Sequence, residues 1–129
     1  MGIDVTPGTP GFGTDLSGST AVAQPASDPT AATAAANAQV QTTYAAVAGQ
    51  RHRLTMLEFS YSAAPAGGRI TVTDGGPTIF DLDVTATGDR PVTLPPGGIR
   101  GSVNAAMVIT LAAGGVGVVG KLCTAKLTG

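Results

Sequence analysis

The 129-residue chain is poor in charge, in lysine and in aromatic side chains. Charged residues make up 12% of it, about half of the roughly 25% usual in globular proteins. It contains no Trp, one His and one Glu, and lysine occurs only at Lys121 and Lys126. Because disordered chains are usually polar or highly charged, this composition predicts a folded protein with a surface of Thr and Ala. Either neighbouring molecules cover much of that surface, or the source genome simply favours Ala and Gly codons.

The single cysteine excludes an intrachain disulfide and a metal site built from thiolates. Cys123 lies in an alternating apolar run, so we expect a small buried side chain. The first residues lack the basic and apolar regions of a secretory signal. Residues 1–6 match the myristoylation pattern, but no basic cluster follows, and we expect no lipid there. The uncharged stretch 102–120 contains four glycines and is interpreted as two short strands rather than a membrane span.

Charge is unevenly distributed along the chain. Residues 1–50 contain Asp4, Asp15 and Asp28 and no Lys or Arg, whereas residues 51–129 hold seven basic and five acidic residues. Neither part has a basic cluster dense enough to neutralise several phosphates. The sequence therefore predicts neither a nucleic-acid partner nor a membrane partner.

Residues 1–28 are predicted to form an extended N-terminal arm. The unit Thr-Pro-Gly occurs at residues 6–8 and again at 9–11, and its prolines and glycines exclude a persistent helix or a central strand. Apolar residues are spaced singly along this segment, which suits a chain lying along the surface of another protein; a plain disordered tail is the alternative. The expected partner-binding residues of the arm are Ile3, Val5, Pro7, Pro10, Phe12 and Leu16.

The rest of the chain, residues 29–129, is predicted to be a single β domain. Residues 29–37 are ambiguous, because Asp28-Pro29 can start a helix while the Ala/Thr run can form a strand. The strand is favoured, because the later segments of the chain all have the β period. Period-two alternation and turn signals predict strands over 40–49, 52–63, 69–73, 78–85, around Val92 and Leu94, over 105–112 and over 118–127.

For two of these strands the sequence also predicts which side chains face the core. In 78–85, Phe80, Leu82 and Val84 are expected to face inward, with Asp81 and Asp83 outward. In 52–63, Leu57, Phe59 and Tyr61 share one parity while Leu54 and Met56 have the other. That change of parity predicts a β-bulge, or burial on both faces near Met56.

These elements predict an all-β fold, a single jelly roll or β-sandwich of about seven or eight strands with an extended N-terminal arm. A body of roughly 90 residues with few aromatic side chains buries a modest core, and chain entropy offsets most of its stabilisation. We therefore expect a homo-oligomer, in which identical subunits cover one another.

No catalytic pattern is recognised, and we expect a protein that is not an enzyme and uses no cofactor or metal. His52 is the only histidine, and we expect a hydrogen-bonding role for it. There is no Gly-x-Ser-x-Gly turn, and the glycines at 114–117 lack the Lys-Ser/Thr ending of a phosphate loop. Asp81 and Asp83 share one face of a strand, but a solvent-facing strand ordinarily alternates in this way.

Three stretches carry a resemblance to a known class of proteins. They are AAVAGQRHRL at 45–54, FSYSAAPAGGRITVTDGG at 59–76 and GGIRGSVNAA at 97–106. Together, over about residues 38–127, they resemble the β-rich virion proteins of tailed bacteriophages. The resemblance implies a capsid decoration (cement) protein on the outer surface of the virion. It further implies a homotrimer whose N-terminal arms reach over the major capsid protein.

Two other functions remain open from the sequence. One is a head-fibre, tail or adhesin module that binds a host-surface glycan or protein. The other is an accessory domain of an enzyme, which would need a fused catalytic chain.

Overall fold

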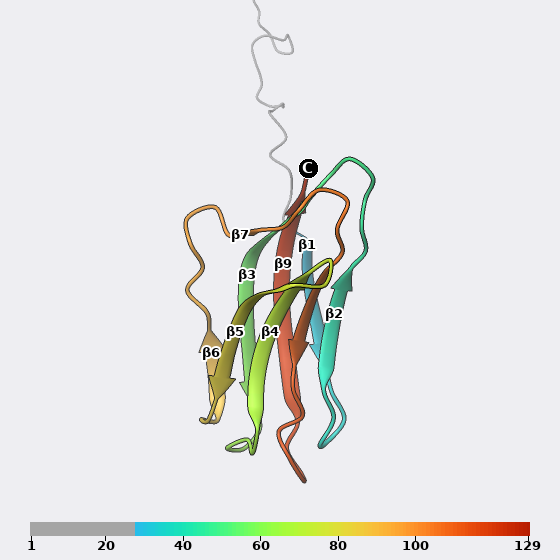
Figure 1. Cartoon of the computed structure of the whole chain (residues 1–129). Coiled ribbons are helices and arrows are strands. Elements are labelled where there is room, and N and C mark those ends of the chain that lie inside the picture. Colours follow the sequence, from blue (N-terminus) through green and yellow to red (C-terminus); the bar gives the residue numbers. More distant parts are fainter. Residues whose placement is uncertain (1–27) are drawn as a thin grey trace, which may run out of the picture.

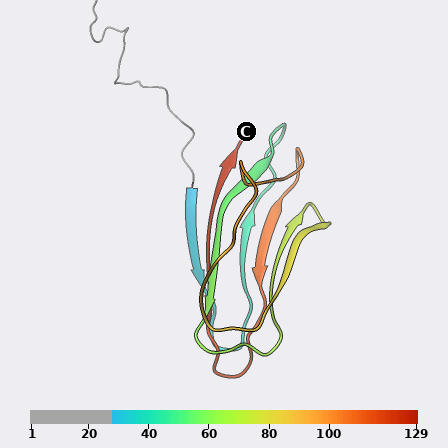
Figure 2. The same cartoon turned by 90° about the vertical axis from the view of Figure 1, so that its left-hand side faces the viewer.

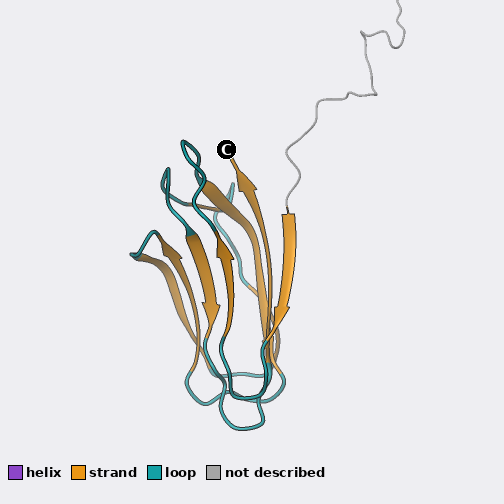
Figure 3. Cartoon of the chain, turned by 90° about the vertical axis from the view of Figure 1, so that its right-hand side faces the viewer, coloured by secondary structure: helices purple, strands orange, loops and turns teal. Residues whose placement is uncertain are grey.

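The computed structural model describes residues 28–129, which fold into two antiparallel β-sheets packed face to face (Figure 1). Within this part of the chain there is no helix, and hence none that could cross a membrane (Figure 3). The strands, in chain order, are β1 (Asp28–Thr33), β2 (Val40–Tyr44), β3 (His52–Tyr61), β4 (Gly68–Asp74), β5 (Thr78–Val84), β6 (Gly88–Pro91), β7 (Ile99–Arg100), β8 (Met107–Leu111) and β9 (Gly120–Thr128).

The strands form nested antiparallel pairs that are divided between the two sheets. One sheet has the order β1-β9-β3-β6, with the short β7 also on β3, and the other has the order β2-β8-β4-β5 (Figure 2). The antiparallel pairs β1–β9, β2–β8, β3–β6 and β4–β5 are nested, each enclosing the next along the chain. This nesting across two sheets is the pairing scheme of a jelly roll. The predicted all-β sandwich is therefore confirmed.

The core lies between the sheets and follows the period-two alternation of the strands. β2 and β8 bury every second residue, and Leu54, Ile70, Val72, Ile109 and Leu111 are completely buried. Each such side chain contributes about 1.5–3 kcal/mol relative to leaving it exposed. Tyr61 is also buried, and its hydroxyl donates a hydrogen bond of 2.6 Å to the Ala112 carbonyl. Burial raises the pKa of this hydroxyl above its ordinary value.

The predicted irregularity in β3 is a β-bulge. The register between β3 and β9 shifts between Leu54, opposite Lys126, and Met56, opposite Ala125. Because of the extra residue, the side chains on both sides of the bulge point toward the core, so that Leu54 and Leu57 are both buried while Met56 is half-buried. The change of parity seen in the sequence thus marks a real feature of the strand.

The ambiguous segment after Asp28 is a strand, β1, as favoured. The strand expected around Val92 and Leu94 is wrong in position, because β6 ends at Pro91. Val92 still donates its N–H to the Leu57 carbonyl, at 2.9 Å, but the ladder ends there. Pro95 and Pro96 have no N–H to donate, so the chain passes along β3 without pairing until β7.

Two predictions of side-chain burial are also corrected. Leu82 is 48% exposed and Phe80 is half-buried, although Val84 is buried as expected. The reason is that β5 is an edge strand, so that no further strand covers its flank. Cys123 is half-buried rather than buried, because Leu122 and Thr124 on either side of it point into the core.

Candidate functional site

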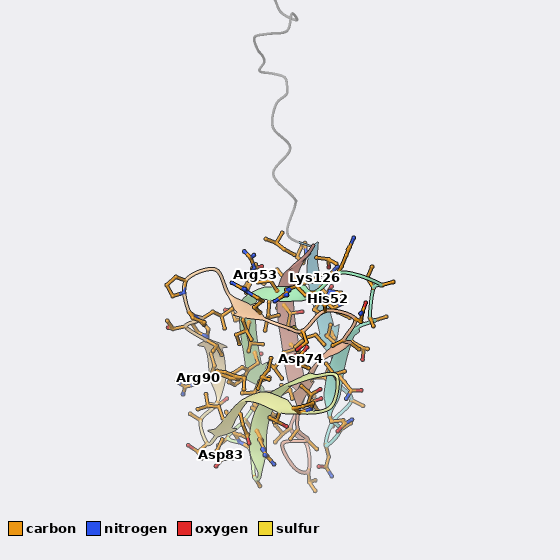
Figure 4. All side chains as sticks on the ribbon, turned by 45° about the horizontal axis from the view of Figure 1, so that its top comes forward. His52, Arg53, Asp74, Asp83, Arg90 and Lys126 are labelled. Atoms are coloured by element: carbon orange, nitrogen blue, oxygen red, sulfur yellow. The ribbon has the colours of Figure 1, made fainter. Side chains whose placement is uncertain are left out.

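The arm residues predicted to bind a partner (Ile3, Val5, Pro7, Pro10, Phe12 and Leu16) lie outside the described residues 28–129. The structure does describe where this segment joins the body. β1 begins at Asp28, which is paired with Lys126 near the end of β9. The start of β1, the end of β9 and the start of β3 therefore lie at one end of the sandwich, where Figure 4 shows His52, Arg53 and Lys126.

A polar network fills the core at this end. His52 is 3% exposed, and its Nε2 lies 2.7 Å from the Ala45 carbonyl oxygen, while its Nδ1 lies 2.9 Å from Thr128 Oγ1. A carbonyl only accepts, so Nε2 carries a proton and donates to Ala45, while Nδ1 shares a hydrogen bond with the Thr128 hydroxyl. Lys126 Nζ in turn donates to Thr128 Oγ1 at 2.7 Å. The expected hydrogen-bonding role of His52 is confirmed, since it ties β3 to β9 and to the loop after β2.

The network continues across the sandwich through Tyr44. Its hydroxyl and Thr124 Oγ1 are 2.5 Å apart and buried, which joins β2 of one sheet to β9 of the other. The Tyr44 ring lies 5.9 Å from the His52 ring, and Lys126 Nζ lies 5.5 Å from the centre of the Tyr44 ring. These contacts fix the shape of the end of the body from which the N-terminal segment leaves.

An apolar hollow lies outside this end, between β3 and the segment that connects β6 to β7. Its volume is about 460 Å³. Met56, Val92, Leu94 and Leu127 line it and are all half-buried, and Arg53 and Glu58 are the charged residues of its lining. Because the β-bulge turns Met56 outward, the irregularity of β3 helps to create this hollow.

A second hollow, of about 540 Å³, continues from the first and is basic. Arg51, Arg53 and Arg100 line it together with Leu127, and both Arg53 and Leu127 also line the apolar hollow. Arg53 is paired directly with Arg100 on β7, and like charges in this position destabilise a sheet. None of the three arginines forms an ion pair with another side chain of the described chain. We call the continuous surface of both hollows the arginine groove.

The arginine groove was missed by sequence reasoning. Arg100 is far from Arg51 and Arg53 in the sequence, and no basic cluster was recognised. The two-residue strand β7 brings Arg100 beside Arg53, and a strand so short has no period-two pattern to reveal it.

A third hollow, of about 540 Å³, lies where the two sheets part at the edges formed by β5 and β6. Phe59, Phe80, Leu82 and Val92 line it, and the exposure of Leu82 is the consequence. Asp83 and Arg90 also line it, and Figure 4 shows both away from Arg53 of the arginine groove.

The acidic side chains of Asp81 and Asp74 both have partners within the body. Asp81 forms an ion pair with Arg69, through contacts of 2.5 and 2.7 Å between exposed side chains. Asp74 accepts hydrogen bonds from the backbone N–H and the hydroxyl of Ser102. Among residues 28–129, no three His, Cys, Asp or Glu side chains come together as metal ligands would.

The chain matches no protein-family model, no curated protein and no solved structure.

Proposed function

We propose that this chain is a structural protein of a bacteriophage-type virion, a capsid decoration (cement) protein. In this role a homo-oligomer of β bodies, with a trimer as the expected form, sits on the outer surface of the shell. The N-terminal arms extend over the major capsid protein and add contacts across subunit boundaries.

The observation that supports the proposal is the place where the N-terminal segment joins the body. The chain enters the jelly roll at Asp28, at the same end of the body as the arginine groove. The attachment point of the N-terminal segment and the groove therefore share one end of the body, whereas the buried polar groups beneath it are held in hydrogen bonds that stabilise the body.

Two further features support the same role. Jelly rolls are common in capsid proteins, although a fold by itself does not establish a function. Each contact of a weakly polar arm stabilises a shell only modestly, but the arms of an oligomer act together through their high effective concentration. A surface poor in charge, rich in Thr and Ala, fits a protein whose neighbours cover it.

The proposal is tested with shells that lack the protein. Purified full-length protein is mixed with such shells, which are then sedimented, and the bound protein is measured. We expect co-sedimentation, and we expect deletion of residues 2–27 to abolish it. A matched control replaces these residues with a Gly/Ser segment of equal length, which keeps the spacing and removes the side chains.

The deletion should leave the body folded, because the core residues and all nine strands of the structure lie in residues 28–129. Circular dichroism of the truncated protein checks this point. Equal binding by the full-length and truncated proteins would refute the proposed role of the arm. Failure of the full-length protein to bind any shell would refute the decoration function.

A second function, an adhesin-like module for a host-surface glycan or protein, is favoured by one observation. The hollow between β5 and β6 is lined by the half-buried Phe80 and the exposed Leu82, together with the charged residues Asp83 and Arg90. Apolar hollows with a few polar groups at the rim are common ligand sites. Binding to a glycan array in the absence of shells, lost on Phe80→Ala, would favour this function over the first.

A further inference from the structure

We infer that the arginine groove is the docking site for the N-terminal segment of the same molecule, residues 1–27. This inference concerns the free protein and does not depend on a shell.

The first step is charge. Arg53 and Arg100 face each other across the β3–β7 pair, and neither forms an ion pair with a side chain of the described chain. Glu58 and Gly129 also line the two hollows, but the three arginines outnumber the single acidic side chain, so an anionic partner would relieve this repulsion further. Residues 1–27 contain Asp4 and Asp15 and no Lys or Arg, so this segment has the complementary charge.

The second step is the apolar part of the groove. Met56, Leu94 and Leu127 are half-buried and line a hollow of about 460 Å³ directly beside the arginines. The N-terminal segment has acidic and apolar residues close together, with Asp4 between Ile3 and Val5, and Leu16 next to Asp15. A segment of this composition matches a groove in which arginines adjoin apolar side chains.

The third step is reach. Asp28 lies on β1, and Arg53 lies two strands away across β9, a distance of roughly 10 Å at the usual spacing of strands. An extended residue spans about 3.3–3.6 Å, so a few of the residues before Asp28 are enough to reach the groove. Attachment of the segment beside its site gives an effective concentration on the order of millimolar, which favours the same molecule over a second copy.

The docked arrangement has a consequence for the arm. The isolated apolar side chains of residues 1–27 are covered in the free protein, and they become available when a competing surface displaces them. Such a competitor must offer its own cationic and apolar contacts.

A tryptophan placed in the arm tests the inference, because the chain contains no Trp and a single one is an unambiguous reporter. In full-length Phe12→Trp protein, we expect blue-shifted emission, protection from acrylamide quenching, and no dependence of either on protein concentration. Adding Arg53→Glu and Arg100→Glu should move the emission to longer wavelength and remove the protection. The control is Arg90→Glu, an exposed arginine at the β5–β6 hollow, which should leave both signals unchanged.

A charge exchange makes the test specific. Asp4→Lys with Asp15→Lys should also release the tryptophan, and combining these changes with Arg53→Glu and Arg100→Glu should restore its protection. Raising the salt from 0.1 to 1 M shortens the Debye length from about 10 to about 3 Å and should weaken protection in the parent protein. If the groove variants do not fold, the variant with Asp4→Lys and Asp15→Lys still tests the inference, because its β body is unchanged.

Three results would overturn the inference. A tryptophan that is fully accessible in the parent protein means that the segment does not dock. Protection that survives both the groove and the arm variants means that it docks elsewhere. Protection that disappears on dilution means that a second copy supplies the segment. These experiments contain no shells, so none of the three results bears on the proposed decoration function. The co-sedimentation experiment tests that function separately.

Discussion

Thr42 is a buried residue whose hydroxyl makes no hydrogen bond. It is 6% exposed in β2, and among the described residues its Oγ1 is the only buried side-chain polar atom without a partner. Leaving such a group unpaired costs about 1–3 kcal/mol. We expect Thr42→Val to raise the free energy of unfolding by about 1 kcal/mol, as measured by urea denaturation. Thr43→Val, at the exposed neighbouring position, is the control and should change it little; a destabilised Thr42→Val protein would show that the hydroxyl is satisfied.

The pKa of the Asp81 carboxyl depends mainly on Arg69. Its hydrogen bonds from the Arg69 guanidinium hold the pKa of the Asp81 carboxyl below its ordinary value. Because the folded-state pKa is the lower one, the pair stabilises the fold above the ordinary pKa of Asp, and this stabilisation is lost as the pH falls through the folded-state value. In Arg69→Ala the pKa of Asp81 should rise toward the ordinary value, as measured by carboxyl NMR titration. Arg90→Ala should leave it unchanged, and an unshifted pKa in Arg69→Ala would exclude the pair as its cause.

At the scale of elements, the two sheets are joined by a buried hydrogen bond between Tyr44 on β2 and Thr124 on β9. Tyr44→Phe or Thr124→Val alone leaves the other hydroxyl unpaired, and each should destabilise the fold by about 1–3 kcal/mol. The double variant leaves neither group unpaired, so its cost should be smaller than the sum of the single costs. A double-mutant cycle from urea denaturation measures this coupling; additive costs would mean that the two hydroxyls do not depend on each other.

The turn before β7 depends on Gly98. Gly97 and Gly98 both have φ near +82°, but a Cβ on Gly98 would overlap the Leu54 carbonyl, whereas one on Gly97 meets nothing within 4 Å. Gly97→Ala should therefore cost about 1–2 kcal/mol from backbone strain alone, and Gly98→Ala clearly more. Thermal unfolding compares the two variants. Equal costs would mean that the chain can move away from β3 without penalty.

The strands show what local sequence can and cannot predict. Leu54 and Leu57 are three positions apart, so a regular strand would place them on opposite faces of the sheet. If both are core residues, an extra residue must lie between them, and the bulge can be predicted from the sequence alone. Leu82 has the same alternation as a core residue, yet it is exposed because its strand is at an edge of the sheet. The position of a strand within a sheet depends on distant partners, and period-two alternation carries no information about it. The arginine groove was missed for the same reason, since it exists only because β7 pairs with β3.

At the scale of the whole molecule, the nested pairs place residues at opposite ends of the described chain side by side. Asp28 pairs with Lys126 and Val40 pairs with Leu111, while only β4 and β5 form a local hairpin. Long loops must close before such pairs form, and proteins dominated by non-local pairing fold in about milliseconds to seconds. We expect stopped-flow refolding in this range. Refolding within microseconds would show that local contacts dominate instead.

The same nesting determines how the body responds to a pulling force. The start of β1 and the end of β9 are neighbours at one end of an antiparallel ladder, so tension between Asp28 and Gly129 falls on the terminal pair of Asp28 and Lys126 and on the backbone hydrogen bonds between Gly129 and Arg51. The hydrogen bonds of β1 would then break one after another, as in a zipper, rather than all at once in shear. A molecule held by its N-terminal segment and loaded through its C-terminal end is therefore mechanically weak along that line. Load applied across the faces of the two sheets meets the packed core instead.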